Sequence, residues 1–167
     1  MKRLVLFITM FLWVLGVQAE GERTLVFKVD IKDEIGPEVW RLVKKSFEKA
    51  QEENATYILI DMNTYGGMVV YSDSLRSLIL NSKIPVWVFI DNNAASAGAL
   101  ISIACDRIYM REGANIGAAT VVNQSGEAMP DKYQSYMRSM IRATAQAHGK
   151  DTLIEGRDTS YRWKGDP

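Results

Sequence analysis

The sequence has one cysteine, one histidine and no net charge, and each of these scarcities narrows what the chain can be. Its 20 basic and 20 acidic side chains cancel, so there is no electrostatic footprint for nucleic acid and no polybasic membrane patch. Cys105 has no partner for an internal disulfide, and its apolar neighbours in LISIAC predict a buried, inert thiol. We expect no cofactor, no metal ion and no nucleic-acid partner.

A hydrophobic run long enough to cross a bilayer is also missing. Basic residues precede an apolar run at residues 4–17, and the small residue Ala19 closes the segment, which is the pattern of a secretory signal. A run of 14 residues is shorter than the roughly 20 residues that a membrane-spanning helix needs. We expect residues 1–19 to be a signal peptide and residues 20–167 to form one exported domain, on the periplasmic or extracytoplasmic face of the membrane. An uncleaved N-terminal anchor is the alternative.

The rest of the chain alternates strand-like and helix-like segments, and its 47% apolar content suits one globular domain. Strands are predicted at residues 24–30, 57–62, 85–91 and 107–110, with a further short strand between residues 113 and 126. Helices are predicted to begin at Pro37, Met68, Ser96 and Pro130. This alternation predicts an α/β fold with a mostly parallel sheet, helices on its faces, and ligands at the carboxyl ends of the strands.

The C-terminal segment, residues 151–167, is polar and offers no helix or strand to close the domain. A parallel sheet is usually covered on its faces by further chain. We therefore expect the domain to be incomplete at its C-terminus.

One hydroxyl stands among small side chains in DNNAASAGAL, residues 91–100, between an apolar strand and an apolar helix. Ser96 at such a position is ordinarily a helix N-cap, which contributes about 1 kcal/mol to the helix. A cap does not account for the alanines and the glycine around it. A nucleophilic serine needs that clearance, because a substrate carbonyl must come within about 3 Å of its oxygen. The Gly-Gly pair in NTYGG, residues 63–67, taken alone predicts only a tight turn.

A nucleophilic serine needs a base, and the scarcity of histidine restricts the choice. His148 lies at the far end of the last predicted helix, beside the stop residue Gly149, where an exposed cation is ordinary. This argues against a Ser-His-Asp triad. Lys132 lies in the first turn of the helix that Pro130 opens. Lys132 is either an ordinary surface lysine or a general base. The positive end of the helix dipole fits the second alternative, because it favours the neutral amine that a base needs.

Taken together, NTYGG, then DNNAASAGALISIACDRIYMREGANIGAATVV, then PDK opening a long helix resemble the NfeD-type membrane serine proteases. These belong to the Clp protease and signal peptide peptidase A group, which has a crotonase-like fold. The resemblance covers residues 24–150. The Gly-Gly turn, ASAG and GAA in this order are far more specific than any one of them.

The resemblance implies a Ser-Lys dyad, with Ser96 as the nucleophile and Lys132 as the general base. It implies oxyanion donors at the backbone amides of Gly67 and Ala97. The implied substrate cleft includes Tyr65, Gly66 and Met68.

The resemblance also implies partners and further domains. The family substrate is an apolar segment of a stomatin- or prohibitin-like membrane protein, and relatives self-associate, so we expect a homodimer. Complete members often add membrane helices and a small OB-like barrel after the protease domain. This sequence also departs from the family at Tyr65, which stands where a proline usually precedes the two glycines.

Three functions follow in order of preference. The first is an exported serine endopeptidase that uses Ser96 and Lys132 to cleave apolar segments of membrane-associated proteins. The second is a catalytically inactive scaffold or binding module that holds such segments without cutting them. An acyl-CoA enzyme of the crotonase type ranks last, because the sequence supplies neither an acid pair nor a CoA pocket.

Overall fold

The computed structural model describes residues 24–123 and 125–147. The predicted signal peptide, His148 and the polar C-terminal segment therefore lie outside the described residues. The elements follow in the order β1 (Val26–Ile31), α2 (Pro37–Glu52), β2 (Tyr57–Thr64), α3 (Val69–Leu80), β3 (Val86–Ala95), α4 (Ala97–Ala104), β4 (Arg107–Met110), β5 (Asn115–Gly117) and α5 (Asp131–Ala147). No helix within these residues has the length and apolarity to cross a membrane.

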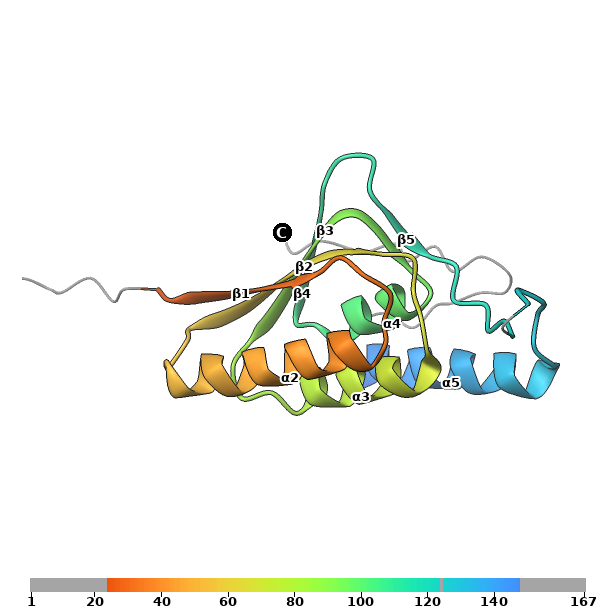
Figure 1. Cartoon of the computed structure of the whole chain (residues 1–167), viewed down its shortest axis with the longest axis horizontal. Coiled ribbons are helices and arrows are strands. Elements are labelled where there is room, and N and C mark those ends of the chain that lie inside the picture. Colours follow the sequence, from red (N-terminus) through yellow and green to blue (C-terminus); the bar gives the residue numbers. More distant parts are fainter. Residues whose placement is uncertain (1–23, 124, 148–167) are drawn as a thin grey trace, which may run out of the picture.

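The strands form one parallel sheet, which confirms the predicted fold class (Figure 1). The strand order is β1-β2-β3-β4, and β5 pairs with β3 as well. Strand β3 is long enough to pair with both β4 and β5. Its residues 87–90 pair with β4, and its residues 93–95 pair with β5. The end of β3, where the chain turns into α4, is therefore held between β2 and β5.

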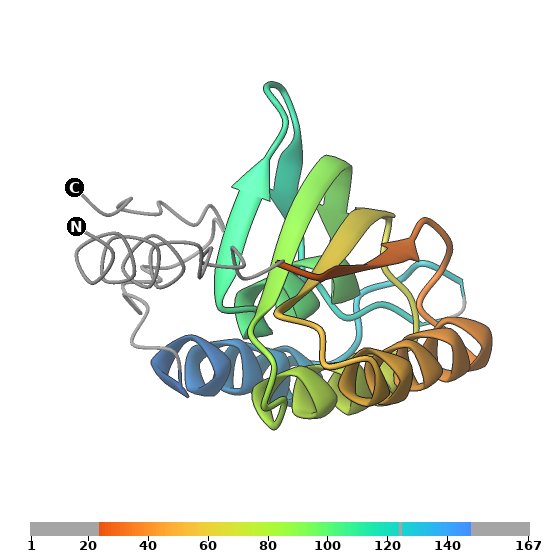
Figure 2. The ribbon, with the colours of Figure 1, turned by 90° about the vertical axis from the view of Figure 1, so that its left-hand side faces the viewer.

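The helices of the described chain gather on one face of the sheet (Figures 1 and 2). Successive side chains of a strand point to opposite faces, and β2 shows the result clearly. Ile58, Ile60 and Met62 are buried, whereas Leu59 and Asp61 between them are only partly buried. The same alternation runs through β3 except at Asn92, which is exposed. The main core thus lies between the sheet and the helices.

Helix α2 buries the face that its sequence predicts: Val39, Val43 and Phe47 recur at helical spacing and are all buried. Pro37 occupies the first turn, where its missing N–H costs nothing. Helix α3 begins one residue later than predicted. Met68 is its N-cap and is 54% exposed, so this side chain is outside the core.

A second apolar cluster joins α4 to α5. Every residue of α4 is buried, because α4 packs against β3, α3 and α5 at once. The buried members of the cluster are Leu100, Ile103, Met137, Met140, Ile141 and Ala145. Helical spacing places Tyr133, Met137, Met140, Thr144 and Ala147 on one face of α5. The middle of this face is buried, whereas Tyr133 and Ala147 at its two ends are exposed. Helix α5 is therefore docked through its middle, which leaves its first turn available for a site.

Truncating the α4 side of this cluster tests how α5 is held. We expect Leu100→Ala to lower the free energy of unfolding by about 2–5 kcal/mol, because it leaves a cavity under α5. Leu42→Ala is the matched control, since Leu42 is 51% exposed on α2, and it should cost no more than about 0.5 kcal/mol. Urea denaturation of the two variants gives the comparison. Equal costs would show that the α4–α5 cluster does not stabilise the domain.

Candidate functional site

Ser96 lies between β3 and α4 in a backbone conformation that serine rarely adopts. Its φ is 51° and its ψ is −112°, which is a strained combination for a residue with a side chain. Its N–H donates to Gly117 O at 2.8 Å, and its carbonyl accepts from Ala99 N at 3.1 Å. The hydroxyl makes no capping hydrogen bond. The N-cap interpretation is thus right for the position of Ser96 and wrong for the use of its hydroxyl.

Gly66 is pressed directly against Ser96. A Cβ at Gly66 would lie 2.7 Å from Ser96 Cβ and 3.2 Å from its Oγ, and the φ of Gly66 is +117°. Only glycine meets both conditions, because the φ is disfavoured for other residues and the space for a side chain is already occupied. The NTYGG segment is therefore more than a tight turn, since it brings the end of β2 against the Ser96 hydroxyl.

Gly67 is held by the loop that follows β1. Ile35 N–H donates to Gly66 O at 2.8 Å, and Met68 N–H donates to Ile35 O at 2.8 Å. These bonds involve the residues on either side of Gly67, so its own N–H points away from Ile35. In the described part of the chain, neither this N–H nor that of Ala97, the first residue of α4, donates a hydrogen bond.

Thr64 is a part of the site that the sequence analysis missed. Its Oγ1 donates to Asp33 O at 2.7 Å and accepts from Gly66 N–H at 3.2 Å, which fixes the turn from inside. Its methyl group also explains Gly98, where a Cβ would lie 2.8 Å from Thr64 Cγ2. A threonine at the end of an apolar strand, two residues before a glycine pair, was the available signal. Tyr65, next to it, is 81% exposed.

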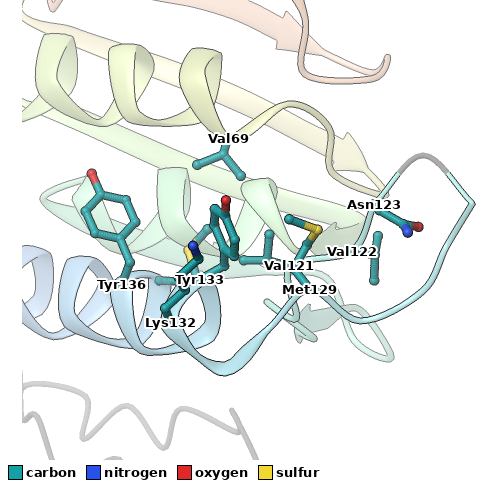
Figure 3. Close-up of a pocket in the computed structure, with 9 residues that line it drawn as sticks. Val69, Val121, Val122, Asn123, Met129, Lys132, Tyr133 and Tyr136 are labelled. Carbon is teal, nitrogen blue, oxygen red and sulfur yellow. The ribbon is translucent and has the colours of Figure 1, made fainter.

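Lys132 is exposed on the first turn of α5 and lines an open cavity of about 810 Å³ (Figure 3). The lining residues are Val69, Val121, Val122, Asn123, Met129, Lys132, Tyr133, Tyr136 and Met137. Nearly all of these are apolar or aromatic, so the cavity suits an apolar group. Lys132 Nζ lies 5.1 Å from the centroid of the Tyr133 ring.

The structure brings together some of the predicted site residues and not others. Ser96, Gly66 and Gly67 are assembled by the ends of β2 and β3. Lys132 lines the neighbouring apolar cavity, and within the described residues its Nζ forms no hydrogen bond with Ser96. Cys105 is buried, as predicted. No group of acidic, histidine or cysteine side chains in the described ranges has the arrangement of a metal site.

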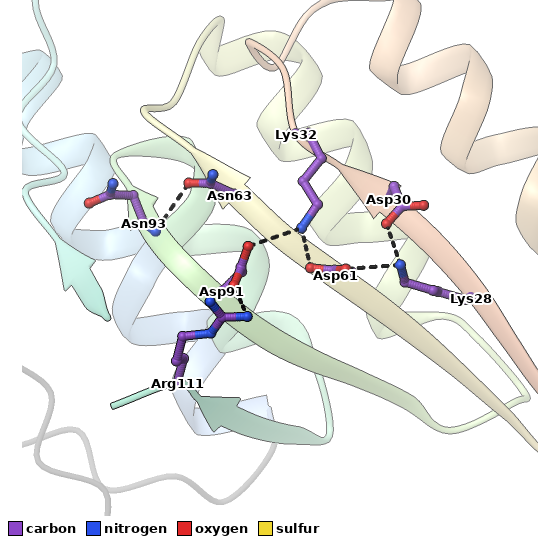
Figure 4. Close-up of polar contacts among 8 residues, drawn as sticks. All are labelled: Lys28, Asp30, Lys32, Asp61, Asn63, Asp91, Asn93 and Arg111. Atoms are coloured by element: carbon purple, nitrogen blue, oxygen red, sulfur yellow. Dashed lines mark hydrogen bonds and ion pairs between the residues drawn. The ribbon is translucent and has the colours of Figure 1, made fainter. Parts of the chain in front are cut away.

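A network of charges crosses the helix-free face at the carboxyl ends of β1, β2 and β3 (Figure 4). Lys28 pairs with Asp30 and Asp61, at 2.8 and 2.9 Å. Lys32 pairs with Asp61 and lies 3.8 Å from Asp91. Because these residues come from three strands, only their register brings them together. The network ties together the strand ends that lead into the Ser96 and Gly-Gly turns.

Asp91 Oδ1 is buried and has no hydrogen-bond partner within the described residues. It lies 2.7 Å from Arg111 Nη2 in an ion pair, and this attraction between opposite charges does not depend on alignment as a hydrogen bond does. Arg111 follows β4, so this pair extends the network to a fourth strand.

The network also shifts the titration of its members. Partial burial raises the pKa of Asp61, but hydrogen bonds from Lys32 and Lys28 outweigh it and hold that pKa below its usual range. Hydrogen bonds to Asp30 and then to Asp61 raise the pKa of Lys28. Both shifts favour the charged forms of Lys28 and Asp61.

Comparison with known proteins identifies relatives over most of the chain. The family model "NfeD1b, N-terminal domain" matches residues 25–156. The chain is similar to the membrane protein NfeD1b of Bacillus subtilis (strain 168), with 32% identity over 140 residues, 83% of this chain and 32% of that protein. It is also similar to the membrane-bound protease PH1510 of Pyrococcus horikoshii, with 29% identity over 140 residues, 79% of this chain and 32% of that protein. The chain thus spans about a third of the length of these relatives.

Solved structures agree with this assignment. A lysine-to-alanine variant of the 1510-N membrane-bound stomatin-specific protease from Pyrococcus horikoshii, in complex with a substrate peptide, has a TM-score of 0.74 at 28% identity. The similarity covers 80% of this chain and 64% of that one. ClpP1 from Listeria monocytogenes has a TM-score of 0.62 at 25% identity, over 81% of this chain and 80% of that one. The fold is therefore of the Clp protease type.

Substitution of Gly66 tests the close approach to Ser96. We expect Gly66→Ala to lower the free energy of unfolding by about 1–3 kcal/mol more than Gly113→Ala does. Gly113 is a matched control because its φ is +80° and a Cβ there would meet nothing within 4 Å, so it isolates the backbone strain. Chemical denaturation measures both costs. If the two variants are equally stable, the Ser96 contact is not tight.

Substitution of Asp61 tests the charge network through its pH dependence. A carboxylate with a lowered pKa in the folded state stabilises the fold above its unfolded pKa, and this contribution is lost as the pH falls through the folded value. Asp61→Asn should therefore be less stable than the wild type near neutral pH, and the difference should shrink as the pH falls through the lowered folded-state pKa of Asp61. Asp33→Asn, an exposed control with no ion pair among the described residues, should show no such trend. A pH-independent difference for Asp61→Asn would contradict the account.

Proposed function

This chain belongs to the NfeD1b N-terminal domain family, and from that premise we propose that it is a serine endopeptidase whose nucleophile is Ser96 and whose general base is Lys132. The observation that carries the proposal is the geometry of Ser96. Its hydroxyl occupies the N-cap position of α4 without capping the helix, in a strained backbone conformation. Strain of this kind persists where the surrounding structure imposes it, and it is concentrated at active sites. Gly66 lies directly beside Ser96, where an added Cβ would be 2.7 Å from Ser96 Cβ.

The proposed reaction begins with proton transfer from Ser96 Oγ to the neutral amine of Lys132. The serine oxygen attacks the scissile carbonyl, and the carbon–nitrogen bond of the resulting tetrahedral intermediate breaks as Lys132 returns the proton to the leaving amine. This gives an acyl-enzyme on Ser96. Water then attacks the ester, again with Lys132 as the base, and releases the acid product.

The backbone amides of Gly67 and Ala97 are the proposed oxyanion donors. Within the described chain, neither N–H donates a hydrogen bond to another group. Both belong to segments that flank Ser96. The Ala97 amide lies at the N-terminal end of α4, where the helix dipole also favours negative charge. Donors fixed in place in this way stabilise charge as it develops on the carbonyl oxygen.

The proposed substrate is an apolar segment of a stomatin- or prohibitin-like membrane protein. The apolar cavity beside Lys132 supports an apolar substrate side chain. Exposed Tyr65 and Met68 extend the proposed cleft, and buried Gly66 between them lies against Ser96. One similar structure is that of a stomatin-specific protease, whose lysine-to-alanine variant was solved with a substrate peptide. A serine-to-alanine variant of the same protease is similar as well.

We further propose that the domain acts at the extracytoplasmic face of a membrane, as a homodimer. The relatives are a membrane protein and a membrane-bound protease, which supports a membrane-associated setting. The basic and apolar N-terminal pattern supports export.

The alternative function is a scaffold that holds apolar segments without cutting them. One observation favours it: Ser96 and Lys132 make no hydrogen bond with each other within the described residues. The same cavity would then bind the segment, and neither residue would be needed for binding.

Three variants distinguish the enzyme from the scaffold. Ser96→Ala should abolish cleavage of a leucine-rich peptide, by at least about 10³-fold in kcat, while binding of the peptide persists. Lys132→Ala should have a similar effect. Lys132→Arg should be inactive as well, because arginine stays protonated and cannot accept the serine proton. Cleavage is followed by mass spectrometry of the products.

Ser139→Ala and Lys45→Ala are the controls, because both side chains are exposed on helices away from Ser96. They should cleave at the wild-type rate. Cleavage that survives Ser96→Ala would rule out this nucleophile. A folded wild-type protein that binds the peptide and never cuts it would favour the scaffold.

A further inference from the structure

One wall of the apolar cavity is a small hairpin, which we call the cavity hairpin and which pairs residues 121–123 with residues 127–129. Val122 forms an antiparallel bridge with Ala128. Asn123 N–H donates to Glu127 O at 2.9 Å, and Met129 N–H donates to Val121 O at 2.9 Å. A two-stranded hairpin of this length is marginally stable by itself in water. Its position must therefore be fixed by contacts with the rest of the domain.

The side chain of Gln134, on α5, closes the open end of this hairpin. Its Oε1 accepts from Val121 N–H at 3.0 Å. Its Nε2 donates to Val121 O at 2.7 Å and to Met129 O at 3.0 Å. Both amide hydrogens of Gln134 are thus used, and its oxygen is used as well. One side chain therefore contacts both strands of the hairpin at their base.

The hydrogen bonds of Gln134 fix the position of the cavity hairpin relative to Lys132. The hairpin contributes Val121, Val122 and Met129 to the cavity lining, whereas α5 contributes the opposite wall. Gln134 follows Lys132 by two positions on the same helix. Gln134 is itself partly buried, so water competes less for its hydrogen bonds than at an exposed site. The same short stretch of α5 therefore positions both walls of the cavity.

We propose that Gln134 is a positioning residue that holds the cavity hairpin as a wall of the apolar cavity and so sets the affinity for an apolar substrate side chain. This rests on the proposed function, in which that cavity receives the side chain. Gln134 touches neither Ser96 nor the scissile bond in this account, and it acts through Val121 and Met129. Its loss should therefore affect substrate binding more than the chemical step.

Two substitutions separate hydrogen bonding from packing. Gln134→Glu keeps the size of the side chain and the acceptor for Val121 N–H, but it removes both donors and turns carboxylate oxygen towards the carbonyls of Val121 and Met129. Gln134→Ala removes all three bonds. Gln146→Glu and Gln146→Ala are the matched controls, because Gln146 is exposed on the same helix.

With the intact chain and a fluorogenic leucine-rich peptide, each Gln134 variant should raise KM at least about fivefold and change kcat less than about twofold. Amide hydrogen exchange at Val121 should accelerate about tenfold or more in Gln134→Ala, since its acceptor is gone. The Gln146 variants should match the wild type in both measurements. A wild-type KM for Gln134→Glu would overturn the proposal, as would a loss confined to kcat.

The test is independent of whether the domain cleaves peptides. Binding of a fluorescently labelled leucine-rich peptide to the Ser96→Ala chain reports on the cavity alone, and Gln134→Ala in that background should weaken it at least about fivefold. Unchanged peptide affinity together with unchanged Val121 exchange would overturn the role of Gln134. A wild-type chain that fails to cleave while these two effects are present would instead count against the proposed peptidase.

Discussion

The contact between Gly66 and Ser96 is the constraint on which the site depends. Two loops that leave neighbouring parallel strands meet with no space for a side chain at Gly66, beside Ser96 with its φ of 51°. Each surrounding feature supports this contact. Thr64 Oγ1 accepts a hydrogen bond from Gly66 N–H and so fixes the glycine turn. Gly117 O, on β5, accepts a hydrogen bond from Ser96 N–H. The charge network joins the strands that lead into both turns. A serine hydroxyl freed from helix capping is the outcome.

The second half of the site is held in a different way. Helix α5 is docked by apolar contacts along its middle, with Met137 and Met140 packed in the cluster that includes Leu100. Its first turn, with Lys132, extends beyond this cluster and faces the apolar cavity. Ser96, the proposed nucleophile, thus lies at a strand–helix junction, whereas Lys132, the proposed base, lies on a helix end beside a hairpin. The two halves differ in what fixes them, and the three hydrogen bonds of Gln134 belong to the second half.

Much of this arrangement was predictable from local sequence. The apolar spacing of α2 at Val39 and Val43, the strand runs and the position of Ser96 all follow from patterns within a few residues. The contacts of Gly98 with Thr64 and of Gln134 with the hairpin do not, because each joins segments that only the fold brings together. The charge network is of the same kind, since it depends on the register of three strands. The periodicity of α5 indicates one apolar face but not that its ends are exposed, because tertiary packing decides how much of a helix is covered.

The most direct test of the account is covalent labelling of the folded chain with a small fluorophosphonate, followed by mass spectrometry to identify the modified residue. The account predicts a label on Ser96 in the wild type. It also predicts loss of that label after unfolding in urea and in Lys132→Ala, because the hydroxyl needs both its turn and its base. A folded wild-type chain with no label on Ser96, or equal labelling of Ser96 in Lys132→Ala, would contradict it.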